Sequence, residues 1–272
     1  MPDTSFVAGE SLMLFTSGRE GNFDIYTMDA DGTALRRLTG DPAVDQSADW
    51  SPDGLRIAFM SNRGGDYEIW VMLVNGRGLR QLTDNVAADG FPRWSPDGSR
   101  ILFTSNRDGN LELYVMRADG ANPTRLTWSP GDDIHGTWSP DGSSIAFTSG
   151  RDGNTEIYVM RSEGTDVVRL TNNSALEGRA AWSPDGSRMA FHAYRDGNAD
   201  IYVIDADGMS ETQLTHDPAK DRFPMWSPDG RRIGFTSDRN GDDEIYIITA
   251  DGTGLVRLTN SAGLDVLDSW RR

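Results

Sequence analysis

The sequence predicts an all-β fold, a six-bladed β-propeller built from four-stranded antiparallel blades. A tryptophan-containing pentapeptide recurs every 44 residues, and a period of this size is typical of solenoids, propellers and arrays. Within each period, short runs of β-branched and aromatic residues alternate with Asp-Gly turns. Six such units fill the chain of 272 residues. Because one small sheet cannot bury both of its faces alone, we expect the six sheets to stack around a common axis.

The pentapeptide Trp-Ser-Pro-Asp-Gly marks the repeat. It starts at Trp50, Trp94, Trp138, Trp182 and Trp226, and Trp270 lies one period further on. Counting back one period from Trp50 reaches Phe6, so another unit precedes the first pentapeptide. We therefore expect one propeller domain over residues 1–272, with units at about 6–49, 50–93, 94–137, 138–181, 182–225 and 226–269.

Each unit holds four expected strands, as the unit starting at Trp138 illustrates. The first strand ends at the tryptophan, the second runs through Ile145 and Phe147, the third covers 157–160 and the short fourth lies at the Arg-Leu-Thr before residue 172. Ile145 and Phe147 point to one face and the alanine between them to the other, so both faces are apolar. The Ser-Pro-Asp-Gly and Arg-Asp-Gly-Asn segments supply Pro and Gly where tight turns need them.

The end of the chain is expected to close the ring. Residues 265–270 copy the segment that precedes each pentapeptide, whereas residues 1–6 copy it badly. We expect 265–270 to form the innermost strand of the first blade, hydrogen-bonded beside residues 12–17. Deleting the chain from Asp265 onward should then destabilise the fold far more than deleting residues 1–5.

Composition and charge exclude several classes of partner. The chain has 42 acidic and 26 basic residues and a net charge of −16, so its surface repels nucleic acid and anionic lipid. No run approaches the ~20 apolar residues of a membrane-spanning helix, and the first residues lack the basic and apolar regions of an export signal. Without cysteine, the chain forms neither disulfides nor thiolate metal sites. We expect a monomer with no membrane insertion.

The repeat units resemble a known family. Units such as 138–171, WSPDGSSIAFTSGRDGNTEIYVMRSEGTDVVRLT, are similar to the β-propeller repeats of the TolB family. The resemblance implies a six-bladed propeller that binds a protein or peptide segment without catalysis, and a periplasmic location. Related repeats occur in the propellers of tricorn protease and of prolyl oligopeptidases, so the motif specifies the fold more than the role. The amino-terminal α/β domain of TolB has no counterpart in this sequence.

The last ten residues of each unit diverge while the rest repeats. The units starting at Trp94 and Trp138 share 23 of 44 positions, all within the first 34. In a propeller these connections surround one mouth of the central channel, which is where binding loops on a rigid frame are expected. One acidic column persists there, five residues before each tryptophan: Asp45, Asp89, Asp133, Glu177, Asp221 and Asp265.

Two interpretations of this acidic column stay open. In the first, each carboxylate caps a turn beside its own tryptophan, and no cofactor is required. In the second, the six carboxylates ring the channel and hold a hard cation such as Ca²⁺, which prefers six to eight oxygen ligands, or form an electrostatic socket for a basic peptide. A second acidic column, represented by Glu112, is expected to pair with the hairpin arginine represented by Arg107.

Aromatic and arginine side chains among the divergent residues are further binding candidates, because these types concentrate binding energy at interfaces. They are Phe91, Trp128, His135, Arg179, Arg222, Phe223 and Leu267. The sequence lacks the Gly-x-Ser-x-Gly, His-Glu-x-x-His and phosphate-loop motifs, and we expect no catalytic residue. The predicted function is a non-catalytic protein- or peptide-binding propeller. The alternative is a metal-dependent enzyme, lyase-like or hydrolase-like, or a glycan-binding propeller that uses the same mouth.

Overall fold

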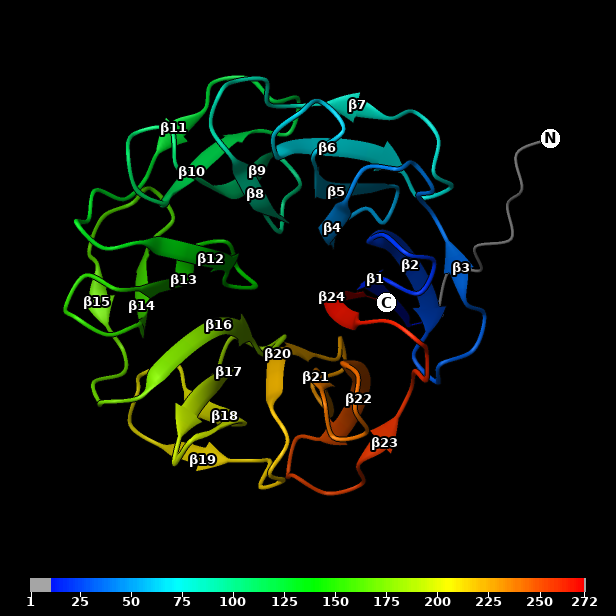
Figure 1. Cartoon of the computed structure of the whole chain (residues 1–272). Coiled ribbons are helices and arrows are strands. Elements are labelled where there is room, and N and C mark those ends of the chain that lie inside the picture. The colour runs from blue at the N-terminus through cyan, green and yellow to red at the C-terminus, as the bar shows by residue number, and fades with distance from the viewer. Residues whose placement is uncertain (1–10, 272) are drawn as a thin grey trace.

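Six antiparallel sheets are arranged in a ring around a central axis (Figure 1). The computed structural model describes residues 11–271, and all regular elements in this range are strands. Each sheet has four strands, and neighbouring sheets face each other as blades. The predicted six-bladed propeller is therefore confirmed. Within residues 11–271 no helix has the length and apolar character needed to cross a bilayer.

The blades are numbered from the one that contains the first described strand. From the axis outward, the first three are: blade 1, β24 (Asp265–Arg271), β1 (Leu12–Ser17), β2 (Asp24–Asp29), β3 (Arg36–Arg37); blade 2, β4 (Asp45–Trp50), β5 (Arg56–Ser61), β6 (Glu68–Leu73), β7 (Arg80–Gln81); blade 3, β8 (Asp89–Trp94), β9 (Arg100–Ser105), β10 (Glu112–Arg117), β11 (Thr124–Arg125). The other three are: blade 4, β12 (Asp133–Trp138), β13 (Ser144–Ser149), β14 (Glu156–Arg161), β15 (Val168–Arg169); blade 5, β16 (Leu176–Trp182), β17 (Arg188–Arg195), β18 (Asn198–Asp205), β19 (Glu211–Gln213); blade 6, β20 (Asp221–Trp226), β21 (Arg232–Ser237), β22 (Glu244–Thr249), β23 (Val256–Arg257).

The hydrophobic core lies between the blades. The second strand of every blade carries a fully buried phenylalanine: Phe15, Phe59, Phe103, Phe147, Phe191 and Phe235. In one cluster, Ile145 and Phe147 of blade 4 pack against Leu102 and Leu113 of blade 3. The alternating residues on both sides of each sheet are thus covered by the two neighbouring blades, as the two apolar faces require.

Strand β24 joins the end of the chain to its beginning. It pairs antiparallel with β1, with Asp265 opposite Ser17 and Arg271 opposite Leu12. Side chains reinforce the closure, since Thr16 donates to Asp268 over 2.6 Å and the Trp270 indole donates to Ser11 over 2.6 Å. The predicted closing strand is confirmed. Residues 1–10, which include the start of the first sequence unit, lie outside the described residues.

The two ends of the channel differ in what surrounds them. The inner strands begin at what we call the loop face, which carries the connections between blades at 38–44, 82–88, 126–132, 170–175, 214–220 and 258–264. They end at the turn face, where each pentapeptide turns into the second strand. In the first of these turns Asp53 accepts from Ser51 over 2.5 Å, and Gly54 has a φ of 68°, which favours glycine.

Candidate functional site

The repeated acidic column lies at the loop-face start of the inner strands and is buried, 0–2% exposed. Each carboxylate pairs with the hairpin arginine of its own blade at 2.6–2.9 Å. The pairs are Arg63–Asp45, Arg107–Asp89, Arg151–Asp133, Arg195–Glu177, Arg239–Asp221 and Arg19–Asp265. In five blades the Nε of the same arginine donates a hydrogen bond to a serine hydroxyl, as Arg63 does to Ser61 over 2.9 Å. We call these six pairs the periodic layer.

The periodic layer shows how the charges of the acidic column are neutralised. Buried charges require a partner, and here each carboxylate has its own arginine rather than a shared cation. Among residues 11–271, no three His, Cys, Asp or Glu side chains are grouped so that they could hold a metal ion. The six carboxylates are therefore buried and paired within their own blades, and the cation ring and the socket for a basic peptide stay predictions. Ca²⁺ elsewhere in the channel stays a prediction.

The second acidic column also pairs differently from the prediction. Glu112 pairs with Arg125 of the outer strand over 2.8 Å, and not with Arg107. The same arrangement joins Arg37 to Asp24, Arg169 to Glu156 and Arg257 to Glu244. In blades 2 and 5 the outer strand has glutamine instead of this arginine, and Glu68 and Asp200 accept hydrogen bonds from Thr83 and Thr215. The second acidic column is therefore paired within its own blade, by an arginine in four blades and by a threonine in the other two.

A β-bulge interrupts the inner strands two residues after the acidic column. In five blades the bulge residue has a φ of 47–58°: Ser47, Phe91, His135, Arg179 and Phe223. The register shifts there, for instance between Gly90 and Arg93. A bulge re-aims a side chain, and positive φ in a non-glycine residue costs about 1–3 kcal/mol that the surrounding structure must offset. Part of that offset is a hydrogen bond from the Arg179 backbone N–H to the Thr148 hydroxyl, 3.0 Å.

The bulge side chains meet across the channel. The Phe91 and His135 rings contact edge to face with centroids 4.5 Å apart. The Arg179 guanidinium lies 4.9 Å from the centre of the Phe223 ring, and His192 packs on the other edge at 5.5 Å. A cavity of about 20 Å³ remains between Phe91, His135 and Arg179, room for roughly one water. At this depth the channel is nearly closed by aromatic and cationic side chains.

Arg179 links blades that are not neighbours. It extends from β16 of blade 5 to β24 of blade 1, past blade 6, and its Nη2 lies 3.4 Å from the Leu267 carbonyl and 3.7 Å from Asp268. Burial lowers the pKa of Arg179 to about 10, so the guanidinium stays charged at neutral pH. Burial also raises the pKa of Asp268, which retains its hydrogen bond from Thr16.

A second ion pair lies in the channel nearer the turn face. Arg93 of blade 3 is 3.7 Å from Asp49 of blade 2. Asp49 also accepts from the Trp94 backbone N–H and from the Ser269 hydroxyl, each over 2.8 Å. Burial raises the pKa of Asp49. The two pairs place arginines and carboxylates in equal number inside the channel, and together with the bulge side chains we call them the channel layer.

Two histidines are uncharged: His135 of the channel layer and His192 of β17, which packs against Phe223. Burial lowers the pKa of His192 to about 3 and that of His135 well below its ordinary value, and the charge of Arg179 lowers both further. His192 Nδ1 is buried without a hydrogen-bond partner. An imidazole with no carboxylate to orient it is a poor general base.

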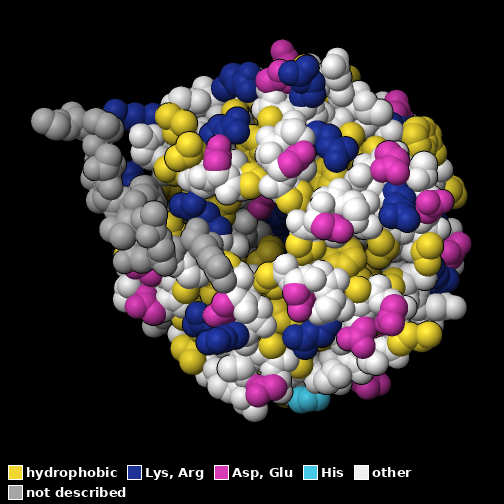
Figure 2. All heavy atoms as spheres, turned by 180° about the vertical axis from the view of Figure 1, so that it is seen from behind, with side chains coloured by type: hydrophobic (Ala, Val, Ile, Leu, Met, Phe, Trp, Pro, Cys, Tyr) yellow, Lys and Arg dark blue, Asp and Glu magenta, His cyan; other side chains and the backbone are white. Residues whose placement is uncertain are grey.

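Arg222 stands at the loop-face entrance to this layer. Its guanidinium is half-buried and contacts both oxygens of Asp243, at 2.7 and 2.9 Å. It also lies 5.5 Å from the centre of the Phe223 ring. Figure 2 views the ring from the opposite end, the turn face, where its centre is hollowed and bordered by hydrophobic and basic side chains.

The structure thus brings together most of the predicted non-acidic candidates. Phe91, His135, Arg179 and Phe223 converge in the channel, with Arg222 above them. Trp128 and Leu267 differ: Trp128 is 68% exposed at the rim, and Leu267 is fully buried. The sequence analysis missed Asp49, Arg93, Asp268 and His192. His192 had a signal in the sequence, because it stands where four other blades have threonine, whereas the positions of Asp49, Arg93 and Asp268 vary from blade to blade.

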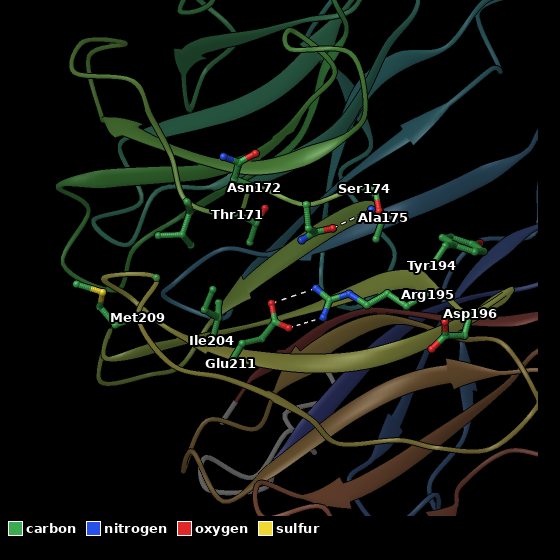
Figure 3. Close-up of a pocket in the computed structure, with 13 residues that line it drawn as sticks. Thr171, Asn172, Ser174, Ala175, Tyr194, Arg195, Asp196, Ile204, Met209 and Glu211 are labelled. Carbon is green, nitrogen blue, oxygen red and sulfur yellow. Dashed lines mark hydrogen bonds and ion pairs between the residues drawn. The ribbon is translucent and has the colours of Figure 1, made fainter.

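A groove at the rim between blades 4 and 5 was also missed. It has a volume of about 640 Å³ and runs between the connection 170–175 and the hairpin of blade 5 (Figure 3). Arg195 lies at its centre, paired with Glu177 and with both oxygens of Glu211. Tyr194 and Met209 are 39% and 85% exposed at the groove. Blade 5 lacks the hairpin serine, which is Ala193 here, and this frees Arg195 to turn outward.

Comparisons with known proteins agree with this architecture. The family model for the TolB β-propeller domain, PD40, matches residues 4–88, 80–180 and 172–271. A search of curated protein sequences finds no significant match.

Among solved structures, TolB from Acinetobacter baumannii matches 96% of this chain with a TM-score of 0.85 and 24% identity, and the chain spans 66% of that protein. A putative TolB from Agrobacterium tumefaciens matches 96% of this chain and 92% of its own, with a TM-score of 0.78 and 23% identity. Hydrazine synthase from Kuenenia stuttgartiensis matches 95% and 47%, with a TM-score of 0.76 and 18% identity. At these identities the structural matches show a shared fold alone.

Proposed function

Because the chain belongs to the TolB β-propeller domain family, we propose that it is a non-catalytic binding module that receives a protein or peptide segment at the loop-face mouth of its channel. The observation that supports this most is the contrast between the two layers. The periodic layer repeats one arginine–carboxylate pair six times, whereas the bulge residues differ from blade to blade. Side chains that vary on a repeated backbone scaffold are typical of a recognition surface.

The side chains at the loop-face mouth favour binding of a peptide segment that presents an apolar side chain together with its backbone carbonyl groups. Phe91, His135 and Phe223 offer ring edges that are only partly buried, and Arg222 adds a half-buried cation at the entrance. Aromatic and arginine side chains dominate the binding energy of many interfaces. An extended segment would place one apolar side chain over these rings and its carbonyl oxygens near Arg222.

The family also favours a periplasmic location for the binding event. The chain spans 66% of the length of the Acinetobacter protein, so activities that depend on the remainder of such a protein are not carried over. The alternative, a metal-dependent enzyme or a glycan-binding propeller, would use the same mouth; among residues 11–271 no three His, Cys, Asp or Glu side chains are grouped to hold a metal ion.

A photo-crosslinking residue at position 91 tests the proposal. We expect it to capture a defined protein from an envelope extract, and the same residue at Leu55, which is exposed at the turn face, to leave that protein uncaptured. The captured protein should then bind purified wild-type chain in isolation. Equal capture from both positions would overturn the proposal.

Metal content tests the alternative in the same preparation. We expect elemental analysis to find no stoichiometric transition metal. A calcium titration tests the predicted Ca²⁺ separately, and an unchanged melting temperature would count against it. A stoichiometric metal whose removal abolishes partner binding or releases an activity would favour the enzyme.

A further inference from the structure

At five of the six blade interfaces, an arginine covers the indole of the pentapeptide tryptophan. The guanidinium carbon lies 4.2–5.5 Å from the ring centre in the pairs Arg271–Trp50, Arg56–Trp94, Arg100–Trp138, Arg188–Trp226 and Arg232–Trp270. These five tryptophans are 4–7% exposed. A guanidinium over an indole gains from the charge distribution of the ring, and the stacking also removes the ring face from water.

The covering cation comes from two different places in the sequence. Four of the arginines begin the second strand of the preceding blade, and Arg56 there also lies 3.7 Å from Asp53 of its own turn. In blade 1 this position is Leu12, and Arg271 from β24 covers Trp50 instead. The recurring element is therefore the cation on the indole, and not one sequence position.

The interface between blades 4 and 5 lacks this cation. Ser144 occupies the arginine position, and among residues 11–271 no arginine or lysine lies over Trp182. Trp182 is only partly buried, unlike the other five tryptophans. A cavity of about 560 Å³ opens there, lined by Ser144, Trp182, Asp141 and Asp185 together with two prolines of the flanking turns. We call it the Trp182 pocket.

Two carboxylates give the Trp182 pocket a negative charge. Asp141 accepts hydrogen bonds from Ser139 and Ser143, which lower its pKa to about 2. Asp185 has the equivalent bonds from Ser183 and Ser187, and its pKa is also lowered to about 2. Both are ionised at neutral pH. In the equivalent turn of blade 2, the carboxylate of Asp53 faces Arg56.

We propose that the Trp182 pocket binds the guanidinium of an arginine side chain that a partner protein or peptide presents at the turn face. The five internal copies define the occupant: a planar cation stacked on the indole, with a turn carboxylate beside it. A guanidinium fits this geometry better than an ammonium, because it is flat and weakly hydrated. The cavity is larger than one guanidinium, which leaves room for the backbone of the segment that carries it. The site lies on the opposite face from the proposed mouth and is independent of it.

The test uses short peptides and the indole N–H signals of the intact chain in NMR spectra. The probe is acetyl-Gly-Arg-Gly-amide, and the matched control replaces arginine with citrulline, which keeps the shape and removes the charge. We expect the Trp182 signal, assigned with W182F, to shift saturably with the arginine peptide and at least about tenfold more weakly with the citrulline peptide. The lysine peptide should bind more weakly than the arginine peptide.

Two substitutions make the result decisive. S144R supplies the missing arginine from the chain itself and should abolish the peptide response of Trp182 while leaving the fold intact. R100S removes the arginine over Trp138 and should create a second responding indole. An unchanged response in S144R, or no saturable shift of Trp182 in the wild type, would overturn the proposal even if R100S proves too unstable to use. Capture through position 91 should be the same in S144R and wild type. Failure of the Trp182 pocket proposal can therefore be distinguished from failure of the proposed binding at the loop-face mouth.

Discussion

The periodic layer and the channel layer both contain arginine–carboxylate ion pairs, but the pairs of the first repeat in every blade and those of the second do not. Both pair arginines with buried carboxylates of the inner strands, but the periodic pairs join an inner strand to the hairpin arginine of the same blade at 2.6–2.9 Å, whereas Arg179 extends past a whole blade to Asp268 at 3.7 Å. The short pairs repeat because they stabilise every blade in the same way. The long pairs do not repeat, because the six inner strands face one shared space. The comparison teaches that symmetry in the sequence indicates scaffold and that its breakdown indicates a site.

The most severe way to break both layers is to remove β24. A chain ending before Asp265 loses that carboxylate from the periodic layer, Asp268 from the channel layer and the strand that pairs with β1. We expect the cooperative thermal transition to disappear, measured by circular dichroism. Removal of residues 1–5 is the control and should leave a cooperative transition. Similar melting of the two truncated chains would show that the ring does not depend on its closing strand.

Breaking one periodic pair comes next. D45A leaves Arg63 buried without its partner and should cost about 3–5 kcal/mol of unfolding free energy, measured in urea. Because the layer repeats, D221A should cost the same within about 1 kcal/mol. Very different costs at these two positions would contradict the equivalence of the blades.

A smaller effect should come from pH, through His192, which packs against the channel layer. His192 titrates at a pKa of about 3 in the fold against 6.5 when unfolded, so the unfolded chain takes up the proton first as the pH falls. The stability contributed by neutral His192 is therefore complete above about pH 6.5 and is lost toward pH 3, by up to about 2 kcal/mol between pH 7 and 5. H192T, which restores the residue of other blades, should remove this part of the pH dependence. Parallel stability curves for H192T and wild type would contradict the buried neutral state.

Much of the fold could be read from the sequence because it rests on period and pattern. The tryptophan spacing indicates the blades, and the likeness of 265–270 to other inner strands indicates the closure. The ion pairs could not be read in this way. Ser61 pairs with Asp45 on one side and Glu68 on the other, so Arg63, two residues later, has two periodic carboxylates within reach. Only the three-dimensional packing decides between them.

The channel layer escaped prediction for a different reason. A bulge at Phe91 and His135 has no residue signature, because serine, phenylalanine, histidine and arginine all adopt the same positive φ in different blades. The Trp182 pocket could be predicted from the sequence in part. Serine at position 144 stands out in the aligned units, but its meaning depends on knowing that this column covers the tryptophan of the next blade.

The most direct test of the central claim is the affinity of R222A for the protein captured through position 91. Arg222 is half-buried at the mouth and belongs to no periodic pair, so its removal should leave the melting temperature nearly unchanged. We expect binding to weaken at least about tenfold. R117A, which alters an exposed arginine at the rim, is the matched control and should bind like the wild type. Equal affinities for R222A, R117A and wild type would contradict recognition by the channel layer.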